Sequence, residues 1–222
     1  MNCKHYGKCF LRSVLAGLSI GMGGCVFMAM STGEYKWVGA ILFSIGLFTV
    51  YTFGFDLYTG KVGYAVENKP PFIIDLLIMI VGNFVGALII GWMIPMSDAA
   101  AAVIVDARLD GDIDWWRVFC KGVFCGVLMF IAADVYKTQK SYLGAFVCVP
   151  VFILSGFEHS IADMFYFCSA GEFTMDAFLF VLVVILGNGV GGIVIPECRK
   201  YFKETPGGAV EAVKKALADD DS

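Results

Sequence analysis

Charged residues are scarce in this chain of 222 residues: they make up 16% of it, whereas hydrophobic residues make up 59%. The mean hydropathy is correspondingly high, at +0.77. A soluble domain needs far more polar side chains to cover its surface. The few charged residues lie mostly between long apolar runs. Composition therefore excludes a mainly soluble protein and predicts an integral membrane protein with little soluble mass.

The chain also lacks the residue clusters that enzymes and sensors need. Its two histidines, His5 and His159, are far apart in the sequence, and its eight cysteines form no Cys-x-x-Cys pair. Cysteines inside apolar runs are typical small packing residues. There is no metal-ligand cluster, no nucleophile pair and no soluble output domain. We therefore expect no enzymatic activity, no cofactor, no metal site and no nucleic-acid partner.

Six apolar windows have the length of about 20 residues that crosses a bilayer. They cover residues 10–30, 37–58, 71–94, 115–135, 142–167 and 175–195. Lysine and arginine gather before the first window, after the second, after the fourth and after the sixth. Positive charge marks the cytoplasmic side of a membrane protein. The sequence thus predicts a multi-pass protein of the cell (inner or plasma) membrane with both termini in the cytoplasm.

Two of these windows are interrupted. The fifth breaks at Ser155-Gly156-Phe157-Glu158-His159, and the second ends in a glycine-containing stretch, 53–60, that leads into a half-apolar segment. An ionisable group at membrane depth costs about 2.5 kcal/mol or more, so such groups usually line a polar path. Non-helical backbone there must be buried in protein or face a water-filled cavity. The two breaks therefore predict a pathway for a solute.

The two halves of the chain repeat a motif of glycine and asparagine. The motif consists of Gly82, Asn83 and Gly86 in the third window and of Gly187, Asn188 and Gly191 in the sixth. Glycines at this spacing let helices pack closely, and asparagines can join helices by hydrogen bonds. Three windows per copy is an odd number, so the second copy must enter the membrane inverted, as in transporters with broken helices. We predict a channel domain, 1–200, built from inverted repeats at 10–95 and 115–196, and a cytoplasmic tail, 201–222.

The nine residues from Gly156 to Met164 resemble the Gly-Phe-Glu-His-Ser-Ile-Ala-Asn-Met signature of the formate/nitrite transporter family. Further matches at 43–47, 54–59 and 82–87 are colinear with that family over most of 10–196. The resemblance implies an all-α, aquaporin-like fold of six transmembrane helices with the second and fifth broken. It also implies a homo-pentamer in the lipid bilayer, with one pore per protomer. Members pass small monovalent anions: formate, nitrite, hydrosulfide, acetate or lactate.

The resemblance also assigns residues to the pore. It places Thr59 opposite His159, where the threonine hydroxyl can donate a hydrogen bond to an anion; capping of the helix after the break is a compatible role. It places hydrophobic constrictions on both sides of this pair, at Phe43, Leu47, Leu57, Tyr58 and Phe152. Taken without the resemblance, the same five side chains could equally face lipid.

The remaining polar and glycine residues of the two breaks are expected to support the interrupted helices. They are Gly54, Asp56, Ser155, Gly156, Glu158 and Asp163. A carboxylate facing the pore would repel anions. We therefore expect Glu158 to turn away from the pore and to accept hydrogen bonds from backbone N–H groups at the break.

The chain departs from the family pattern at three places. Asp163 replaces the asparagine of the signature, and Gly126 stands where the fourth helix usually carries an asparagine near the histidine. Family members often have an anion-attracting lysine just before the fourth helix. This chain offers only Arg108, in an acidic loop, and Lys121, inside the fourth window.

The resulting hypothesis is a channel for weak-acid anions that is linked to protons. Apolar constrictions oppose a bare ion because it must lose its water, whereas a weak acid can cross them in its protonated form. An unperturbed histidine changes charge near pH ~6.5, so His159 is the candidate proton donor to an anion held at Thr59. The alternative is an aquaporin-like channel for neutral small solutes, but the paired Asn-Pro-Ala loops of that family are absent.

Overall fold

The computed structural model describes residues 3–204, and all of its regular elements are helical. In chain order they are α1 (Cys3–Met30), α2 (Lys36–Leu42), α3 (Ser44–Phe53), α4 (Tyr58–Lys61), η1 (Val62–Glu67), α5 (Phe72–Met93), α6 (Asp98–Ala101), η2 (Ala102–Asp106), α7 (Ala107–Leu109), α8 (Trp115–Gln139), α9 (Leu143–Leu154), α10 (Ser160–Ala170) and α11 (Met175–Glu204). The predicted all-α membrane fold is confirmed. Most of the predicted cytoplasmic tail, 201–222, lies outside the described residues, which end at residue 204.

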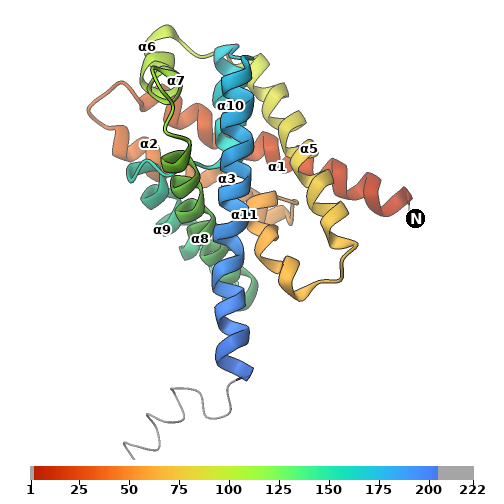
Figure 1. The fold of residues 1–222 in the computed structure, drawn as a ribbon. Coiled ribbons are helices and arrows are strands. Elements are labelled where there is room, and N and C mark those ends of the chain that lie inside the picture. The colour runs from red at the N-terminus through yellow and green to blue at the C-terminus, as the bar shows by residue number, and fades with distance from the viewer. Residues whose placement is uncertain (1–2, 205–222) are drawn as a thin grey trace, which may run out of the picture.

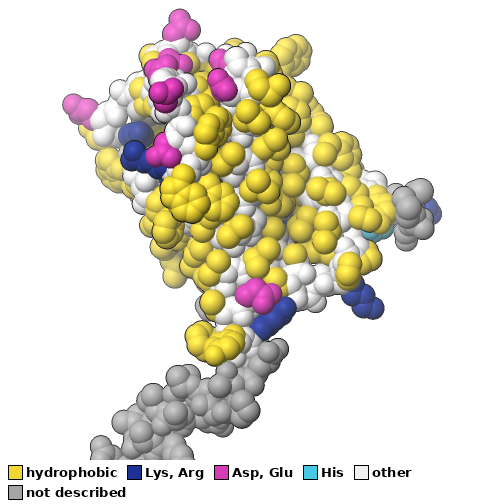
Figure 2. Space-filling model, viewed as in Figure 1, with side chains coloured by type: hydrophobic (Ala, Val, Ile, Leu, Met, Phe, Trp, Pro, Cys, Tyr) yellow, Lys and Arg dark blue, Asp and Glu magenta, His cyan; other side chains and the backbone are white. Residues whose placement is uncertain are grey.

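Within residues 3–204, five helical stretches are long and apolar enough to cross a membrane. They are Lys4–Met30, Lys36–Phe53, Phe72–Met93, Trp115–Gln139 and Met175–Phe202. The fifth predicted window is divided between α9 and α10, each of which is shorter than a span. Six crossings therefore remain a prediction. Figure 2 shows the matching surface, with hydrophobic side chains across the middle of the molecule and charged side chains toward its ends.

Both predicted interruptions are present. α3 ends at Phe53, and the chain is irregular until α4 begins at Tyr58; α9 ends at Leu154, and α10 begins at Ser160. Gly54 has a φ of 65° and Gly156 a φ of 68°. This left-handed conformation is one that glycine adopts without strain and that commonly ends a helix. The two glycines thus turn the backbone out of its helix inside the apolar region.

The helices pack in two matching sets (Figure 1). α1 packs against α5 in the first half of the chain, and α8 packs against α11 in the second. The segments after the breaks cross to the other half: α10 packs against α1 and α5, whereas α4 packs against α8 and η1 against α11. Each half thus completes the other, which brings the two breaks together at the centre of the protein.

Glycines permit the close approach of helices within each set. A Cβ atom on Gly86 would collide with the carbonyl oxygen of Val14 in α1, and one on Gly191 with that of Val123 in α8. Gly82 and Gly187 lie equally close to α1 and α8. Tight backbone packing of this kind is a usual way to associate helices in lipid. The last helix, α11, continues through Pro196 to Glu204, beyond the end of the predicted window.

Candidate functional site

A buried asparagine fixes the first break. The Asn83 side chain accepts a hydrogen bond from the backbone N–H of Tyr58 (3.0 Å) and donates to the carbonyl oxygens of Ser13 (2.8 Å) and Asp56 (3.0 Å). Asn83 is fully buried. One side chain on α5 therefore joins α1 to the irregular segment and to the start of α4, and it satisfies backbone groups that the break leaves unpaired.

Asn188 fixes the second break in the same way. It accepts from the backbone N–H of Ser160 (2.9 Å) and donates to the carbonyl oxygens of Gly122 (2.8 Å) and Glu158 (2.9 Å). It too is fully buried. The two asparagines thus hold equivalent groups in the two halves of the chain. We call them the Asn83 clamp and the Asn188 clamp.

Thr59 and His159 meet at the centre, one from each half. The Oγ1 atom of Thr59 lies 2.9 Å from Nε2 of His159, and the two residues are 0% and 2% exposed. His159 Nδ1 accepts a hydrogen bond from the backbone N–H of Ala162 (3.1 Å) and so caps α10. No side chain caps the N-terminus of α4. Thr59 therefore does not have the predicted capping role, and its hydroxyl contacts His159 instead.

The Ala162 contact determines the tautomer of the neutral imidazole. Because Nδ1 accepts, the ring proton lies on Nε2 and points to Thr59 Oγ1. The Thr59 hydroxyl accepts this bond and keeps its own proton available for donation. A buried donor is thus presented at the place where the two halves of the chain meet.

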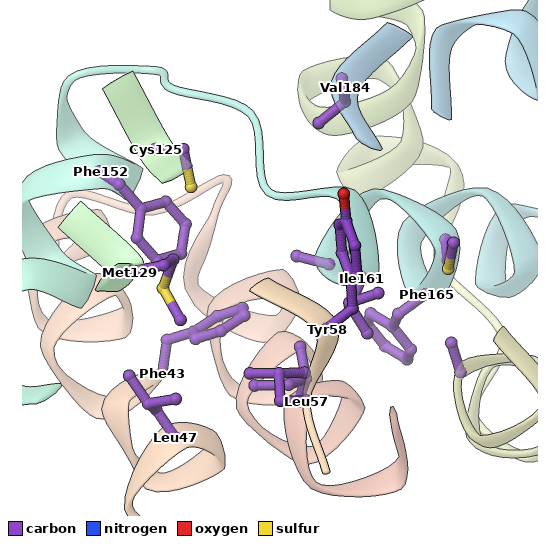
Figure 3. Packing of buried hydrophobic residues seen from close by; sticks show 14 of the residues in the cluster. Phe43, Leu47, Leu57, Tyr58, Cys125, Met129, Phe152, Ile161, Phe165 and Val184 are labelled. Carbon is purple, nitrogen blue, oxygen red and sulfur yellow. The ribbon is translucent and has the colours of Figure 1, made fainter. Parts of the chain in front are cut away.

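Apolar side chains enclose this pair. The Phe152 ring stacks on His159, with centroids 5.5 Å apart and planes at 20°, and Phe43 contacts Phe152 edge-on at 6.1 Å. Leu47 and Leu57 are buried as well. Figure 3 shows Phe43, Leu47 and Phe152 on one side of this cluster and Leu57 on the other. Their burial argues against the lipid-facing alternative.

Tyr58, the fifth predicted constriction residue, is placed differently. Its hydroxyl donates to the carbonyl oxygen of Ile185 on α11 (3.1 Å), and its side chain lies beside Ile161 in Figure 3. The backbone N–H of Tyr58 belongs to the Asn83 clamp. Tyr58 thus anchors α4 to α11, away from the stack of Phe43, Phe152 and His159.

A cavity of about 170 Å³ opens beside His159. Its lining includes Phe152, His159, Lys36, Arg108, Lys121, Glu158 and Asp163. We call it the arginine vestibule. Arg108 Nη2 lies 2.9 Å from Glu158 Oε2, and Lys121 Nζ lies 3.3 Å from Glu158 Oε1. The expectation that Glu158 accepts backbone hydrogen bonds is therefore wrong: cationic side chains from α7 and α8 neutralise its carboxylate.

Three residues named above as departures from the family pattern, Arg108, Lys121 and Asp163, line the arginine vestibule. Arg108 also lies 3.5 Å from Asp163 Oδ1, although neither Asp163 oxygen has a hydrogen-bond partner within residues 3–204. Burial lowers the pKa of Arg108, but Glu158 and Asp163 raise it more, so the net shift is upward and the guanidinium stays charged. At Gly126, a Cβ atom would collide with the backbone of Asn188, which leaves no room for the asparagine usual there.

A second cavity, of about 440 Å³, opens beside Leu57 and Gly60. Its lining also includes Tyr51, Tyr64, Lys61, Lys137 and Lys140, and we call it the lysine vestibule. The carboxylate of Asp56 near this break is paired with Arg12 Nε (3.3 Å) and Lys61 Nζ (3.5 Å). Gly60 follows Thr59 in the chain, whereas His159 lines the arginine vestibule. The Thr59–His159 pair therefore lies between the two cavities.

The ion pairs of the break carboxylates are what the sequence analysis missed: Arg12 and Lys61 were not singled out, and Arg108 and Lys121 were named without their partner Glu158. Arg12 directly precedes Ser13 in α1, and Lys121 directly precedes Gly122 in α8. The carbonyl oxygens of Ser13 and Gly122 each accept a hydrogen bond from an asparagine clamp. A cation at the same register in the first helix of each repeat was a detectable signal. Arg108 had no comparable signal, because it lies in the short helix α7, outside the repeated motif and 50 residues from Glu158.

Comparison with known proteins agrees with this architecture. The chain is 26% identical to the formate channel FocA of Haemophilus influenzae, over 88% of this chain and 87% of that protein. It is 24% identical to a probable formate transporter of Methanothermobacter thermautotrophicus, over 88% of each. A solved pentameric formate channel with formate bound has a TM-score of 0.74 at 22% identity, covering 90% of this chain and 98% of that chain. An FNT family ion channel has a TM-score of 0.76 at 23% identity, covering 89% and 90%.

These two structures show that the helical arrangement is that of a known channel fold. The sequence pattern described as formate/nitrite transporter matches residues 3–202, nearly the whole described chain. With the broken helices and their signature in place, the chain belongs to the formate/nitrite transporter family.

Proposed function

We propose that the chain forms a pentameric channel that passes small monovalent weak-acid anions across the cell membrane, with proton transfer at the Thr59–His159 pair. The observation that carries this proposal is the position of that pair, buried between two cation-lined cavities and enclosed by apolar side chains. Formate and nitrite are the substrates that the family and its named members suggest. Hydrosulfide belongs to the same class of monovalent weak acids.

Entry of the anion follows from the charges of the two vestibules. Lys61, Lys137 and Lys140 line one cavity, and Arg108 and Lys121 line the other. The lysine vestibule has no described carboxylate in its lining, whereas in the arginine vestibule the cations Lys36, Arg108 and Lys121 outnumber Glu158 and Asp163. Cavities with an excess of one sign of charge concentrate counter-ions. Because Arg108 and Lys121 neutralise Glu158, this carboxylate does not repel an approaching anion. Both vestibules therefore attract the substrate from water.

Passage through the centre requires removal of the charge. The side chains of Leu57, Phe43 and Phe152 offer no replacement for water around a bare anion, which makes its desolvation costly. A weak acid avoids this cost by taking up a proton. Thr59 donates a hydrogen bond to the anion, and Nε2 of His159 lies next to it. His159 first takes up a proton from water and becomes an imidazolium. It then passes the Nε2 proton to the anion and returns to the neutral ring. The substrate crosses the apolar segment as the neutral acid.

The direction of the chain in the membrane follows from its cations. The lysine vestibule, with Lys61, Lys137 and Lys140, faces the cytoplasm if positive charge marks the inner side. Both termini then lie on that side, and the arginine vestibule faces outward. Five copies, each with its own pore, form the complete channel.

A flux assay in liposomes tests this function. Proteoliposomes should take up formate or nitrite, and uptake should rise as the external pH is lowered below about 7, because protons accompany the anion. Parallel measurements with hydrosulfide and lactate define the substrate. Protein-free liposomes correct for direct crossing of the bilayer by the neutral acids. Transport of glycerol or water without transport of any weak acid would contradict the proposal and favour a neutral-solute channel.

A further inference from the structure

Asp163 is the signature residue that differs from the family pattern, and its carboxyl group has no role in the pathway described so far. The residue is 1% exposed, and within residues 3–204 neither of its carboxyl oxygens accepts a hydrogen bond. Burial of an ionised carboxylate without hydrogen bonds is unfavourable. The asparagine of the family signature carries no charge at this position. The ionised form of Asp163 is therefore poorly suited to its surroundings.

The donors near Asp163 are directed to a different carboxyl group. Arg108 Nε donates to Glu158 Oε2 at 3.0 Å and lies 3.5 Å from Asp163 Oδ1. Arg108 Nη2 and Lys121 Nζ also lie at Glu158, at 2.9 and 3.3 Å. Arg108 Nη1 donates to the carbonyl oxygen of Ile104. Glu158 thus receives the charged hydrogen bonds that stabilise an ionised carboxylate, whereas Asp163 receives none among the described residues.

A proton between the two carboxyl groups would satisfy both of them. Two carboxylates that share one cation repel each other, which favours the state in which one of them is protonated. The Asp163 and Glu158 carboxyl groups are within hydrogen-bonding reach of each other, but two ionised carboxylates contain no donor. A protonated Asp163 donates to Glu158. The repulsion and the missing hydrogen bond at Asp163 are then both removed.

The remaining ionisable groups that line the vestibule or act on Asp163 do not supply this proton. They are Lys36, Cys125, His159 and Tyr166. Cys125 and Tyr166 are neutral at physiological pH. Both ring nitrogens of His159 are engaged in the hydrogen bonds described above. Lys36 is exposed and adds the same positive charge whether or not Asp163 is protonated.

We propose that Asp163 is a proton-binding residue that sets the charge of the arginine vestibule and thereby its affinity for the anion. The inference deepens the proposed function and rests on it. With Asp163 protonated, the ionised Glu158 balances only one of the two neighbouring cations, Arg108 and Lys121, and the other attracts the anion. When the proton leaves for water by way of Glu158, the two carboxylates balance both cations. Asp163 acts through charge alone, because its oxygens are covered by protein.

Infrared spectroscopy of the full-length protein tests for the proton directly. A protonated carboxyl group has a C=O stretching band that a carboxylate lacks, and a detergent without ester groups leaves this region clear. Between roughly pH 5 and 8, the parent should show such a band at the acidic end, and Asp163→Asn should lack it. The matched control Asp112→Asn, at an exposed aspartate outside the vestibule lining, should keep it. Spectra of the parent and Asp163→Asn that agree in this band at every pH would overturn the proposal.

Formate uptake from the arginine-vestibule side tests the effect on the anion. The half-saturating concentration of the parent should rise about threefold or more from roughly pH 5 to 8, because loss of the proton adds a negative charge near the anion. Asp163→Asn, which is always neutral, should show a smaller rise. Both proteins retain His159, so the difference between the two profiles isolates Asp163. Equal profiles, or profiles that differ by the same factor at every pH, would overturn the proposal.

The two measurements together distinguish failure of this inference from failure of the proposed function. If the parent carries formate and its half-saturating concentration depends on pH as that of Asp163→Asn does, the role of Asp163 is wrong and the channel function stands. If the infrared band is present and lost in Asp163→Asn but the parent carries no weak acid into liposomes, the channel function fails and the proton site remains.

Discussion

His159 makes two contacts that define what its ring can do. The Ala162 N–H occupies Nδ1, and Nε2 faces the Thr59 hydroxyl. The neutral ring is therefore held in one tautomer, with its proton directed at the place where Thr59 can hold an anion. The same two residues come from opposite halves of the chain, so their geometry depends on the correct packing of both breaks.

Thr59 provides a test at this scale. Thr59→Val keeps the shape of the side chain but removes the hydroxyl that donates to the anion. A hydrogen bond to a charged group contributes about 1.5–3 kcal/mol, so formate flux should fall by roughly one to two orders of magnitude. Thr52→Val, at an exposed threonine of α3 whose hydroxyl bonds to Phe48 of its own helix and to Tyr142, is the matched control. Equal flux in the two variants would exclude Thr59 as an anion donor.

Individual contacts also show which features of the site could be predicted from the sequence. The Thr59–His159 contact was expected from the family resemblance, because both residues belong to family motifs in which the threonine faces the histidine across the pore. The ion pairs of Glu158 with Arg108 and Lys121 were not expected, because no periodicity links a residue of α7 or α8 to a helix break in another part of the chain. The unpaired carboxyl oxygens of Asp163 become visible only when burial and partners are known.

At the scale of the element, one asparagine side chain forms the hydrogen bonds that hold each helix break in place. Periodic glycine and polar residues inside apolar windows predicted the breaks and the close packing, since both features are local. The sequence did not determine the continuation of α11 through Pro196, because proline only disfavours a helix at that point. It also did not indicate which backbone groups the asparagines would hold.

The Asn188 clamp can be tested by unfolding. Asn188→Ala leaves the N–H of Ser160 and the carbonyl oxygens of Gly122 and Glu158 without this partner, at about 1–3 kcal/mol for each buried group. The apparent melting temperature in detergent should fall clearly. Asn83→Ala should have a similar effect on the first break. Asn68→Ala, at an exposed asparagine that makes one local hydrogen bond, should change it little. Parent-like melting of Asn188→Ala would show that the clamp does not stabilise the break.

For the whole molecule, the exchange of helices between the two halves explains why they must fold together. Each break is held by an asparagine of its own half but is covered mainly by the other half, because α10 lies against α5 and η1 against α11. The apolar outer surface in Figure 2 is available to lipid and to neighbouring copies. Assembly and orientation in the membrane are therefore the properties to measure.

Native mass spectrometry tests the assembly. The protein released from detergent should give a species of five times the chain mass of 24.1 kDa, because we propose one pore in each of five copies. Collision-induced release of monomers from that species provides the internal control. A stable monomer at all protein concentrations would contradict the pentamer.

Cysteine labelling tests the orientation. In a variant whose native cysteines are replaced, Asn2→Cys and Asp220→Cys should not react with an impermeant maleimide added to intact cells, because both ends are placed in the cytoplasm by the distribution of lysine and arginine. Both sites should react after the cells are permeabilised. Labelling of either site in intact cells would require a different number of crossings.

The central claim is that His159 supplies the proton that lets a weak acid cross the apolar segment. Its most direct test is uptake of labelled formate into proteoliposomes between roughly pH 5 and 8, the range in which histidine commonly changes charge. The parent should show pH-dependent uptake, and His159→Phe, folded as judged by its melting, should show none. His159→Asn keeps hydrogen bonding without titration and should lose the pH dependence. Parent-like pH dependence in His159→Asn would contradict the account, since protonation would then take place away from His159.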